Sequence, residues 1–281
     1  MKQFIVPLSE ISMNDVSFVG GKAASLGELL KVGVKVPQGF VVTTHVYRNF
    51  AGQQLPPDIV AALKLHHARL GGQRVAVRSS AVAEDSLGAS WAGQLETFLN
   101  VDADELPDSI VKCWESMNSE RATAYADNHA VTPSDRAVAV VVQAMIDSDV
   151  AGVMFTANPI NGQSDEFVIE SAYGLGELVV QGLTTPDTFI ASDADGSVRD
   201  HQPHAQQEML MYLDSQQQMI ALSPEQIARP TLAPEQIIEL IEVGKKIAAH
   251  YGVPQDIEWA ISDGQLYVLQ ARPITTLSSP F

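Results

Sequence analysis

One stretch near the end of the chain decides the fold: residues 256–273, with the sequence DIEWAISDGQLYVLQARP. Two runs rich in apolar residues flank Asp263-Gly264, and an Asp-Gly pair in this position is the strongest local indication of a β-hairpin. Four polar residues interrupt the runs, where a purely structural hairpin would carry Val or Thr: Asp256, Glu258, Gln270 and Arg272. These side chains predict a binding surface on the hairpin.

The length of the turn decides whether the polar side chains share a face, because side chains alternate between the two faces of a strand. A two-residue loop pairs Glu258 with Leu269 and sends Gln270 to the opposite face. A three-residue loop, Ser262-Asp263-Gly264 with a left-handed glycine bulge, pairs Asp256 with Gln270 and gathers the four polar residues. We therefore predict the three-residue loop.

Two carboxylates, an amide oxygen and a guanidinium on one surface suit a divalent cation that bridges phosphate oxygens. Arg272 would neutralise the remaining phosphate charge. The alternative is a salt-bridged sheet edge with no ligand.

Composition limits the classes of partner. The chain has 281 residues, with 17 Lys and Arg against 34 Asp and Glu, so the net charge is 17 − 34 = −17. This balance argues against a nucleic-acid or membrane partner.

The chain has a single cysteine, Cys113, which excludes an intrachain disulfide. Its apolar neighbours in the sequence favour a buried structural thiol. Without a signal peptide or a membrane-spanning run, the expected location is the cytoplasm.

Two segments of the first half offer phosphate contacts. Gly20-Gly21-Lys22 opens a helix, which provides backbone donors and a flexible ammonium group, although an ordinary glycine turn with a surface lysine fits equally well. Arg78 ends the buried strand 74–80, and a strand end can aim an arginine rigidly at a phosphate. The small residues of 81–93 suit either a loop that closes over a nucleotide or a mobile surface loop.

Two apolar runs, 137–145 and 150–157, predict a second hairpin around Asp147-Ser148-Asp149. Gln143 lies inside the first run, where its amide needs a partner, either an adenine edge or a neighbouring backbone group. Glu170, on the next strand, is a candidate contact for a hydroxyl or a metal-bound water. Pro234 opens a helix that Gly252 and Pro254 end.

Six segments occur in an order that resembles one known family: Val19 to Lys22, Ala76 to Ser80, Ala92 to Thr97, Ala151 to Thr156, Glu170 to Gly176 and Asp256 to Thr275. Together they resemble the N-terminal ATP-grasp domain of phosphoenolpyruvate synthase, pyruvate phosphate dikinase and rifampin phosphotransferase. The resemblance implies an α+β fold with ATP between two lobes. We expect a first lobe at residues 1–130, a second at 131–277 that includes the adenine strand, and a loose tail at 278–281.

The resemblance also implies ligands and roles, with ATP and Mg²⁺ as cofactors. Lys22, Arg78 and Arg272 would contact phosphates as catalytic groups. Glu258 and Gln270 would hold magnesium. The other cofactor-binding positions would be Gly93 and Thr97 in the closing loop, Gln143 at the adenine, Glu170 and Asp256.

The family's reaction uses ATP to phosphorylate a histidine on a mobile domain, which passes the phosphate to pyruvate, rifampin or another acceptor. The Gly/Thr/Ser-rich surroundings of that histidine are absent from this sequence, and His204 to Glu208 replaces a segment that usually contains a lysine. We therefore expect an Mg-ATP-binding module that needs a phosphohistidine-bearing domain and an acceptor-binding domain, in the same parent chain or separate. The alternatives are a non-catalytic ATP-sensing or scaffold protein and a complete small kinase that acts directly on a metabolite.

Overall fold

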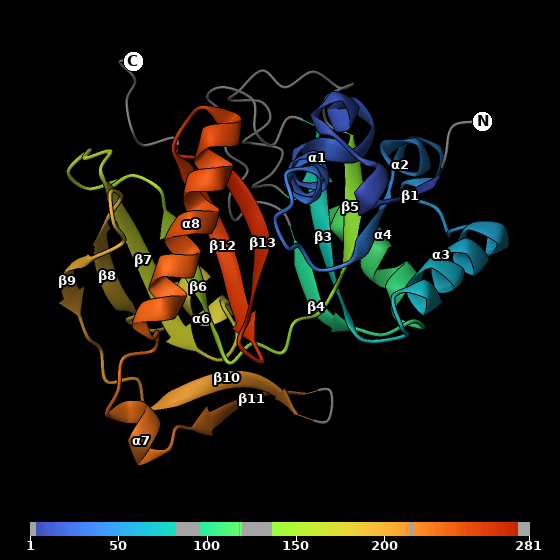
Figure 1. Cartoon of the computed structure of the whole chain (residues 1–281). Helices are drawn as coiled ribbons and strands as arrows, with labels where there is room; N and C mark the ends of the chain where they lie inside the picture. Colours follow the sequence, from blue (N-terminus) through green and yellow to red (C-terminus); the bar gives the residue numbers. More distant parts are fainter. Residues whose placement is uncertain (1–3, 83–95, 118, 120–136, 214–215, 275–281) are drawn as a thin grey trace. The chain divides into compact units, whose positions relative to one another are not determined.

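The computed structural model describes residues 4–82, 96–117, 119, 137–213 and 216–274. By its internal contacts the chain divides into unit 1, residues 1–31 and 37–145, and unit 2, residues 32–36 and 146–281. Figure 1 shows the elements of each unit. The mixture of helices and antiparallel sheets confirms the predicted α+β class.

Within the described part of unit 1, a five-stranded antiparallel sheet has the order β1-β2-β5-β3-β4. Its strands are β1 (Ile5–Pro7), β2 (Gly39–Val42), β3 (Val75–Ala81), β4 (Thr97–Val101) and β5 (Val138–Ala144). Its helices are α1 (Val16–Lys31), α2 (Thr44–Phe50), α3 (Pro57–Arg69) and α4 (Leu106–Ser116).

The described residues of unit 2 form a six-stranded antiparallel sheet in the order β13-β12-β6-β7-β8-β9 and a separate hairpin, β10–β11. The sheet comprises β6 (Val150–Phe155), β7 (Glu166–Tyr173), β8 (Asp187–Ser192), β9 (Val198–Gln202), β12 (Gln255–Ser262) and β13 (Gln265–Pro273). The hairpin comprises β10 (Glu208–Leu213) and β11 (Gln216–Ala221), and the helices are α6 (Glu177–Val180), α7 (Pro224–Ile227) and α8 (Pro234–Tyr251).

One hydrophobic core of unit 1 lies on the face of its sheet that α4 contacts, and the opposite face is also buried at Val41 and Val141. Alternate residues of β3 and β5 point into it, including Val75, Val77, Val140 and Val142, and they pack against Trp114 and its neighbours on α4. Because side chains alternate, the residues between them, such as Arg78 and Gln143, belong to the opposite face. The core thus assigns the polar strand residues to one surface.

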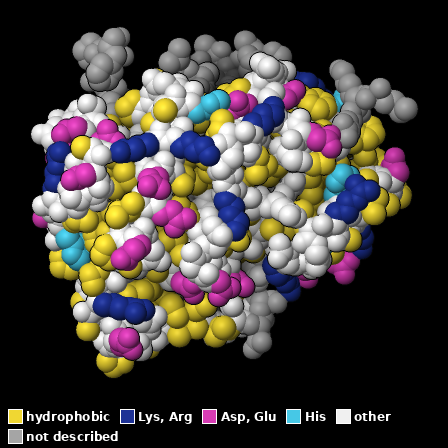
Figure 2. Space-filling model, viewed as in Figure 1, with side chains coloured by type: hydrophobic (Ala, Val, Ile, Leu, Met, Phe, Trp, Pro, Cys, Tyr) yellow, Lys and Arg dark blue, Asp and Glu magenta, His cyan; other side chains and the backbone are white. Residues whose placement is uncertain are grey.

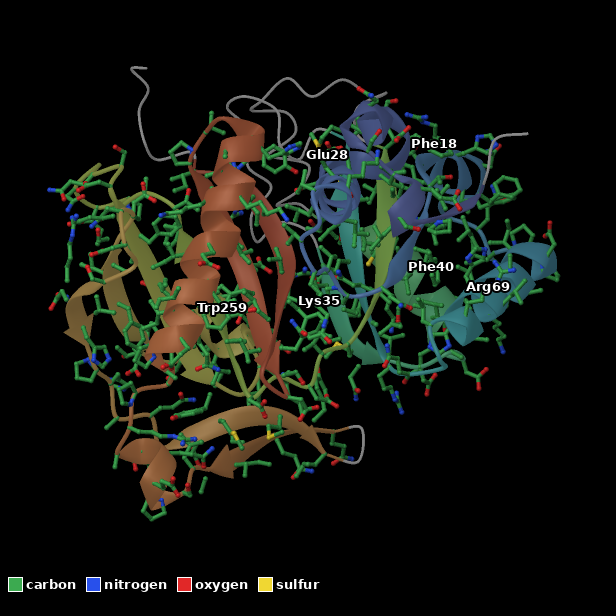
Figure 3. The ribbon with its side chains drawn as sticks, in the orientation of Figure 1. Phe18, Glu28, Lys35, Phe40, Arg69 and Trp259 are labelled. Carbon is green, nitrogen blue, oxygen red and sulfur yellow. The ribbon has the colours of Figure 1, made fainter. Side chains whose placement is uncertain are left out.

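Helix α8 covers one face of the unit 2 sheet (Figure 1). A Cβ added to Gly244 on α8 would meet the side chains of Phe167 and Met154, so glycine permits a close approach of helix to sheet. Trp259 lies on this same face and is 1% exposed (Figure 3). The helix ends as the sequence predicts, at Gly252 in the left-handed conformation.

The predicted second hairpin is wrong. Strand β5 pairs with β2 and β3, whereas β6 pairs with β12 and β7. The segment Asp147-Ser148-Asp149 therefore follows the point where the chain passes from unit 1 to unit 2, after Met145. These pairings place β5, with Gln143, in unit 1.

The turn of the β12–β13 hairpin differs from the prediction, although the shared face does not. Asp263 and Gly264, with φ of 50° and 71°, form a two-residue turn. Ser262 pairs with Gln265, and the register shifts where Glu258 pairs with Gln270. The extra residue that the three-residue loop was expected to supply is Leu269, in a β-bulge within the strand.

Candidate functional site

The hairpin residues belong to two polar rows on one face of the unit 2 sheet. In the first row, Glu170, Val153, Glu258 and Gln270 lie directly opposite one another on β7, β6, β12 and β13. In the second row, Asp256 lies opposite Arg272. This face is the one that α8 does not cover. The structure therefore brings five of the predicted site residues onto one surface.

Arg272 and Asp256 are locked together on this face. Both Nε and Nη2 of Arg272 donate to Oδ2 of Asp256, at 2.8 and 2.7 Å. Burial raises the pKa of Asp256, and the Arg272 guanidinium opposes this shift. Burial also raises the pKa of Glu170, and the negative charge of Asp256 adds to the effect. The ionised forms of Asp256 and Glu170 are therefore destabilised on this face, and a bound cation would stabilise them.

The donor set suits magnesium. Glu258 supplies a carboxylate and Gln270 an amide oxygen from directly paired positions, and both side chains are half-buried. Within the described residues, no group of three or more His, Cys, Asp or Glu side chains could hold a metal ion. Mg²⁺ is commonly held by one or two protein oxygen ligands, with phosphate oxygens and waters completing its shell. Two ligands on this face therefore fit a magnesium ion that arrives with a nucleotide.

Part of the same face is covered by α6. Ala151 lies two residues before Val153 on β6 and therefore on the same face of the sheet. A Cβ added to Gly176, which precedes α6, would lie 3.4 Å from Cβ of Ala151. On this face of β6, α6 thus covers Ala151, and the first polar row begins at the next residue of the same face, Val153.

In unit 1, α1 changes direction at Gly20, whose φ is 78° and ψ 166°. A Cβ there would lie 2.1 Å from the carbonyl oxygen of Ser80, so only glycine fits. The helix restarts beyond the kink, where the Ser80 hydroxyl accepts a hydrogen bond from the N–H of Ala23 at 3.1 Å. Lys22 donates from Nζ to the carbonyl oxygen of Ser79 at 3.1 Å. The kink thus holds Lys22 against the end of β3.

Three further predicted residues share one face of the unit 1 sheet. Arg78 on β3 lies directly opposite Thr97 on β4, and Gln143 on β5 lies opposite Ala76. Because Ala76 and Arg78 are two residues apart, their side chains point to the same side. Ser80 is on that side as well, and it joins α1 to the strand. Gly93 lies outside the described residues.

Gln143 has a partner within unit 1. Its side chain is 3% exposed, and Nε2 donates to the carbonyl oxygen of Pro37 at 3.4 Å. This contact is the backbone alternative considered from the sequence. This bond uses one of the two N–H groups of the Gln143 amide. The other N–H group can therefore donate to a second partner.

The sequence predicted no role for two residues, Ser80 and Gln206. Ser80 accepts a hydrogen bond from Ala23 and so positions the part of α1 that follows the kink. In the sequence, only its position directly after Arg78 and Ser79 could have indicated this role. Gln206 is 7% exposed and contacts the backbone of Tyr173, in the segment where a lysine was expected. The sequence predicts the loss of a lysine in this segment, whereas the bonds of Gln206 depend on the tertiary structure.

These features define the chain as an ATP-binding domain once it is compared with known proteins. Residues 16–64 and 50–280 match the family described as pyruvate phosphate dikinase, AMP/ATP-binding domain. The chain belongs to this family, and the ATP-grasp class predicted from the sequence agrees with that membership.

The relatives are longer proteins. A probable phosphoenolpyruvate synthase of Archaeoglobus fulgidus is 36% identical over 312 residues, which covers 96% of this chain and 41% of that protein. The prodigiosin synthesizing transferase PigC of Serratia marcescens is 38% identical over 306 residues, covering 98% and 34%. The D-alanine–D-alanine ligase of Helicobacter pylori has a TM-score of 0.45 at 13% identity, covering 94% of this chain and 56% of the other. The chain therefore spans less than half the length of these two sequence relatives.

Charge and hydropathy add two observations. On the face drawn in Figure 2, lysine and arginine side chains are scattered among acidic ones. Among the residues that the structure describes, no helix is long and apolar enough to cross a membrane.

Proposed function

We propose that this chain is the Mg-ATP-binding module of a phosphohistidine-shuttle phosphotransferase similar to phosphoenolpyruvate synthase. It would supply a phosphoryl group from ATP to a histidine on a separate domain. The observation that carries the proposal is the pairing of Glu258 with Gln270 beside the bonded pair Asp256 and Arg272, all on one face of unit 2. Membership of an AMP/ATP-binding domain family supports it.

In this proposal, unit 2 binds the metal and one end of the triphosphate. Glu258 and Gln270 would hold Mg²⁺, which neutralises charge on the phosphate oxygens when it is bound. Arg272, oriented by Asp256, would donate to a phosphate oxygen, and Glu170 would accept from a hydroxyl or from water on the metal. Phosphoryl transfer needs mainly such positioning and charge neutralisation from a protein.

Unit 1 would supply the other contacts. Lys22 and Arg78 would neutralise phosphate charge, since Lys22 is held against the Ser79 carbonyl of β3, and Arg78 is carried by the middle of the same strand rather than by its end as predicted. Gln143 would contact the adenine with the N–H that Pro37 does not use. Thr97 would contact phosphate from the start of β4, and Gly93 would belong to the closing loop.

The remaining parts of the reaction lie outside these residues. A phosphohistidine-bearing domain and an acceptor-binding domain would be required, in the same parent chain or in partners, and the greater length of the relatives supports this requirement. We place the reaction in the cytoplasm, with neither nucleic acid nor membrane as a partner.

Calorimetry with ATP in the presence and absence of magnesium tests the binding step. We expect magnesium-dependent binding by the wild type and a loss of at least tenfold in Glu258→Gln and in Arg78→Ala. Glu242→Gln and Arg69→Ala replace exposed residues of the same types and should bind normally. Absence of magnesium-dependent ATP binding by the wild type would reject the proposal.

The second candidate function is ATP sensing or scaffolding without transfer. It is favoured by the segment His204 to Glu208, which lacks the lysine that relatives usually carry. Mixing the protein with a separate phosphohistidine domain separates the two candidates. A phosphotransferase module should leave one phosphate of ATP on the histidine and, with one water consumed, release AMP and inorganic phosphate, whereas a sensor should bind ATP and release nothing.

A further inference from the structure

A buried glutamine attaches the hairpin β10–β11 to the end of β7. The side chain of Gln206 is 7% exposed. Its Oε1 accepts from the N–H of Tyr173 at 2.8 Å, and its Nε2 donates to the carbonyl oxygens of Tyr173 at 3.2 Å and of Glu208 at 2.8 Å. The amide thus bonds to both backbone groups of Tyr173, as a neighbouring strand would.

The attached hairpin contacts the segment that follows β7, where Gly174 pairs with Leu210. Leu175 donates from its N–H to the carbonyl oxygen of Leu210 at 2.9 Å. A Cβ on Gly174, whose φ is 82°, would lie 2.5 Å from that oxygen and 3.0 Å from Cβ of Met209. Gln217 on β11 donates to Glu177 of α6 at 2.9 Å. The hairpin and α6 therefore form one assembly.

This assembly bounds the polar rows on one side. Helix α6 lies over Ala151, on the face that carries Glu170 and Glu258, and the hairpin is fixed to α6. Beyond Glu258 on this face, the next row of the sheet consists of Tyr267, Ala260, Ala151 and Ala172, which lie opposite one another on β13, β12, β6 and β7. The polar rows thus border a buried apolar row beneath α6, the helix to which the hairpin is bonded.

The hairpin itself contributes apolar side chains. Met209 lies opposite Ile220, and Met211 shares their face, and all three are partly exposed. Methionine side chains are flexible and polarizable, which suits them to pack against aromatic rings. The base of a nucleotide whose triphosphate lies at Glu258, Gln270 and Arg272 needs an apolar surface to pack against, and the partly exposed side chains of the hairpin offer one.

We propose that Gln206 is a positioning residue for the nucleotide. It holds the hairpin β10–β11 as the wall at the base end of the site, and the hairpin packs against the apolar ring of the base. This inference rests on the proposed function, because it assumes that the polar rows bind the magnesium triphosphate. Gln206 itself touches the backbone rather than the ligand.

The substitution Gln206→Leu keeps the size of the side chain and removes all of its hydrogen bonds. Gln206→Glu retains the acceptor for the Tyr173 N–H and loses both donations. The matched control is Gln207→Leu, because the amide of Gln207 is exposed and donates only locally, to the carbonyl oxygen of Ala205 at 3.0 Å. Thermal melting of each variant checks that it is folded.

Calorimetry with two probes separates positioning from general damage. Magnesium tripolyphosphate carries the charges of the triphosphate without a base, so its affinity should change less than twofold in Gln206→Leu. Mg-ATP affinity should fall about tenfold, as expected if the hairpin is in place about a tenth of the time. The Mg-ATP affinity of Gln206→Glu should lie between those of the wild type and Gln206→Leu. The affinity of Gln207→Leu should match that of the wild type. Equal losses with both probes, or unchanged ATP affinity, would overturn the inference.

Hydrogen exchange gives an independent measurement. Mg-ATP should slow exchange at the amides of residues 208–213 and 216–221 in the wild type and leave them unprotected in Gln206→Leu. A wild type that binds Mg-ATP without slowing exchange in the hairpin would contradict this inference and leave the proposed function standing. A wild type that does not bind Mg-ATP would contradict both.

Discussion

Arg272 directs Nε and Nη2 to a single carboxylate oxygen, Oδ2 of Asp256, from the strand position directly opposite. The guanidinium is held on the face that carries Glu258 and Gln270, and neither partner is fully exposed. An arginine fixed in this way can meet a phosphate without a large loss of side-chain entropy.

Replacing Arg272 by lysine should therefore impair binding although the charge is kept. An ammonium cannot reproduce the fork of donors, so we expect Mg-ATP affinity to fall about tenfold in calorimetry. Arg199→Lys is the matched control, because Arg199 bonds the exposed Asp165 and lies opposite no residue of the polar rows. Equal effects of the two substitutions would argue against a special role for the Arg272 geometry.

The kink in α1 should be intolerant of alanine. Gly20→Ala forces a side chain to φ 78° and against the Ser80 carbonyl, whereas Gly52→Ala has the same φ with no atom within 4 Å. The left-handed conformation alone costs about 1–2 kcal/mol. We expect Gly52→Ala to lower Tm by a few degrees and Gly20→Ala by at least twice as much, because overlap adds about 1–3 kcal/mol. Similar melting temperatures for the two variants would show that α1 is not held against β3.

The thiol of Cys113 should be inert in the folded protein. Burial raises its pKa to about 12, so roughly one molecule in ten thousand carries a thiolate at pH 8. Since the chain has a single cysteine, labelling by iodoacetamide reports on this site alone. We expect labelling in native buffer to be at least a hundredfold slower than in concentrated urea. Rapid native labelling would mean that α4 opens readily from the sheet.

Glu170 should make stability depend on pH in a defined direction. Burial, together with the charge of Asp256, raises the pKa of Glu170 above its ordinary value of 4.5. The folded state then binds a proton more tightly than the unfolded state, so stability falls as pH rises from 4.5 through the raised pKa. Glu170→Gln cannot ionise, and without ligand it should be more stable than the wild type at pH 7, by roughly 2 °C in Tm.

The same measurement has a control of opposite sign. Hydrogen bonds from Asn158, Asn161 and Arg199 lower the pKa of Glu166, so Glu166→Gln should be less stable than the wild type at pH 7. Urea unfolding between pH 4 and 8 follows both variants. The difference between Glu170→Gln and the wild type should vanish toward pH 4, and a difference that persists there would contradict the assignment to ionisation.

Local sequence patterns predicted several elements correctly. The stop at Gly252 predicted the end of α8, and the Asp-Gly pair predicted a hairpin at residues 256–273. They failed at Asp147-Ser148-Asp149, because a short polar segment between two apolar runs fits a hairpin turn and a passage between sheets equally well. The choice depended on β2 and β12, which are far away in the sequence and pair with β5 and β6.

The shared face of Glu258 and Gln270 was predicted for a reason that was partly wrong. Because side chains alternate along a strand, Glu258 and Gln270 can share a face only if the hairpin contains one extra residue between them. The sequence predicted that this residue lies in the turn. Asp263-Gly264 instead adopts a tight two-residue turn, and the strand absorbs the extra residue at Leu269. Next to the bulge, the N–H of Val268 donates to the carbonyl oxygen of Lys35 at 2.9 Å, and Lys35 lies over the ring of Tyr267 (Figure 3). That partner comes from a segment more than 200 residues earlier in the chain.

The sequence by itself determined which residue types are available for a magnesium nucleotide and where the hairpin turns, because residue identity and the Asp-Gly turn signal are local properties. The tertiary structure decided that Glu258 and Gln270 share a face, because the bulge at Leu269 supplies the extra residue that the two-residue turn does not. Only the tertiary structure decided what accompanies them. Glu170 joins their row through β6, Asp256 bonds Arg272, and Gln206 attaches the hairpin β10–β11 to the end of β7. These relations depend on strand order and on bonds between distant segments, which local conformational preferences do not encode.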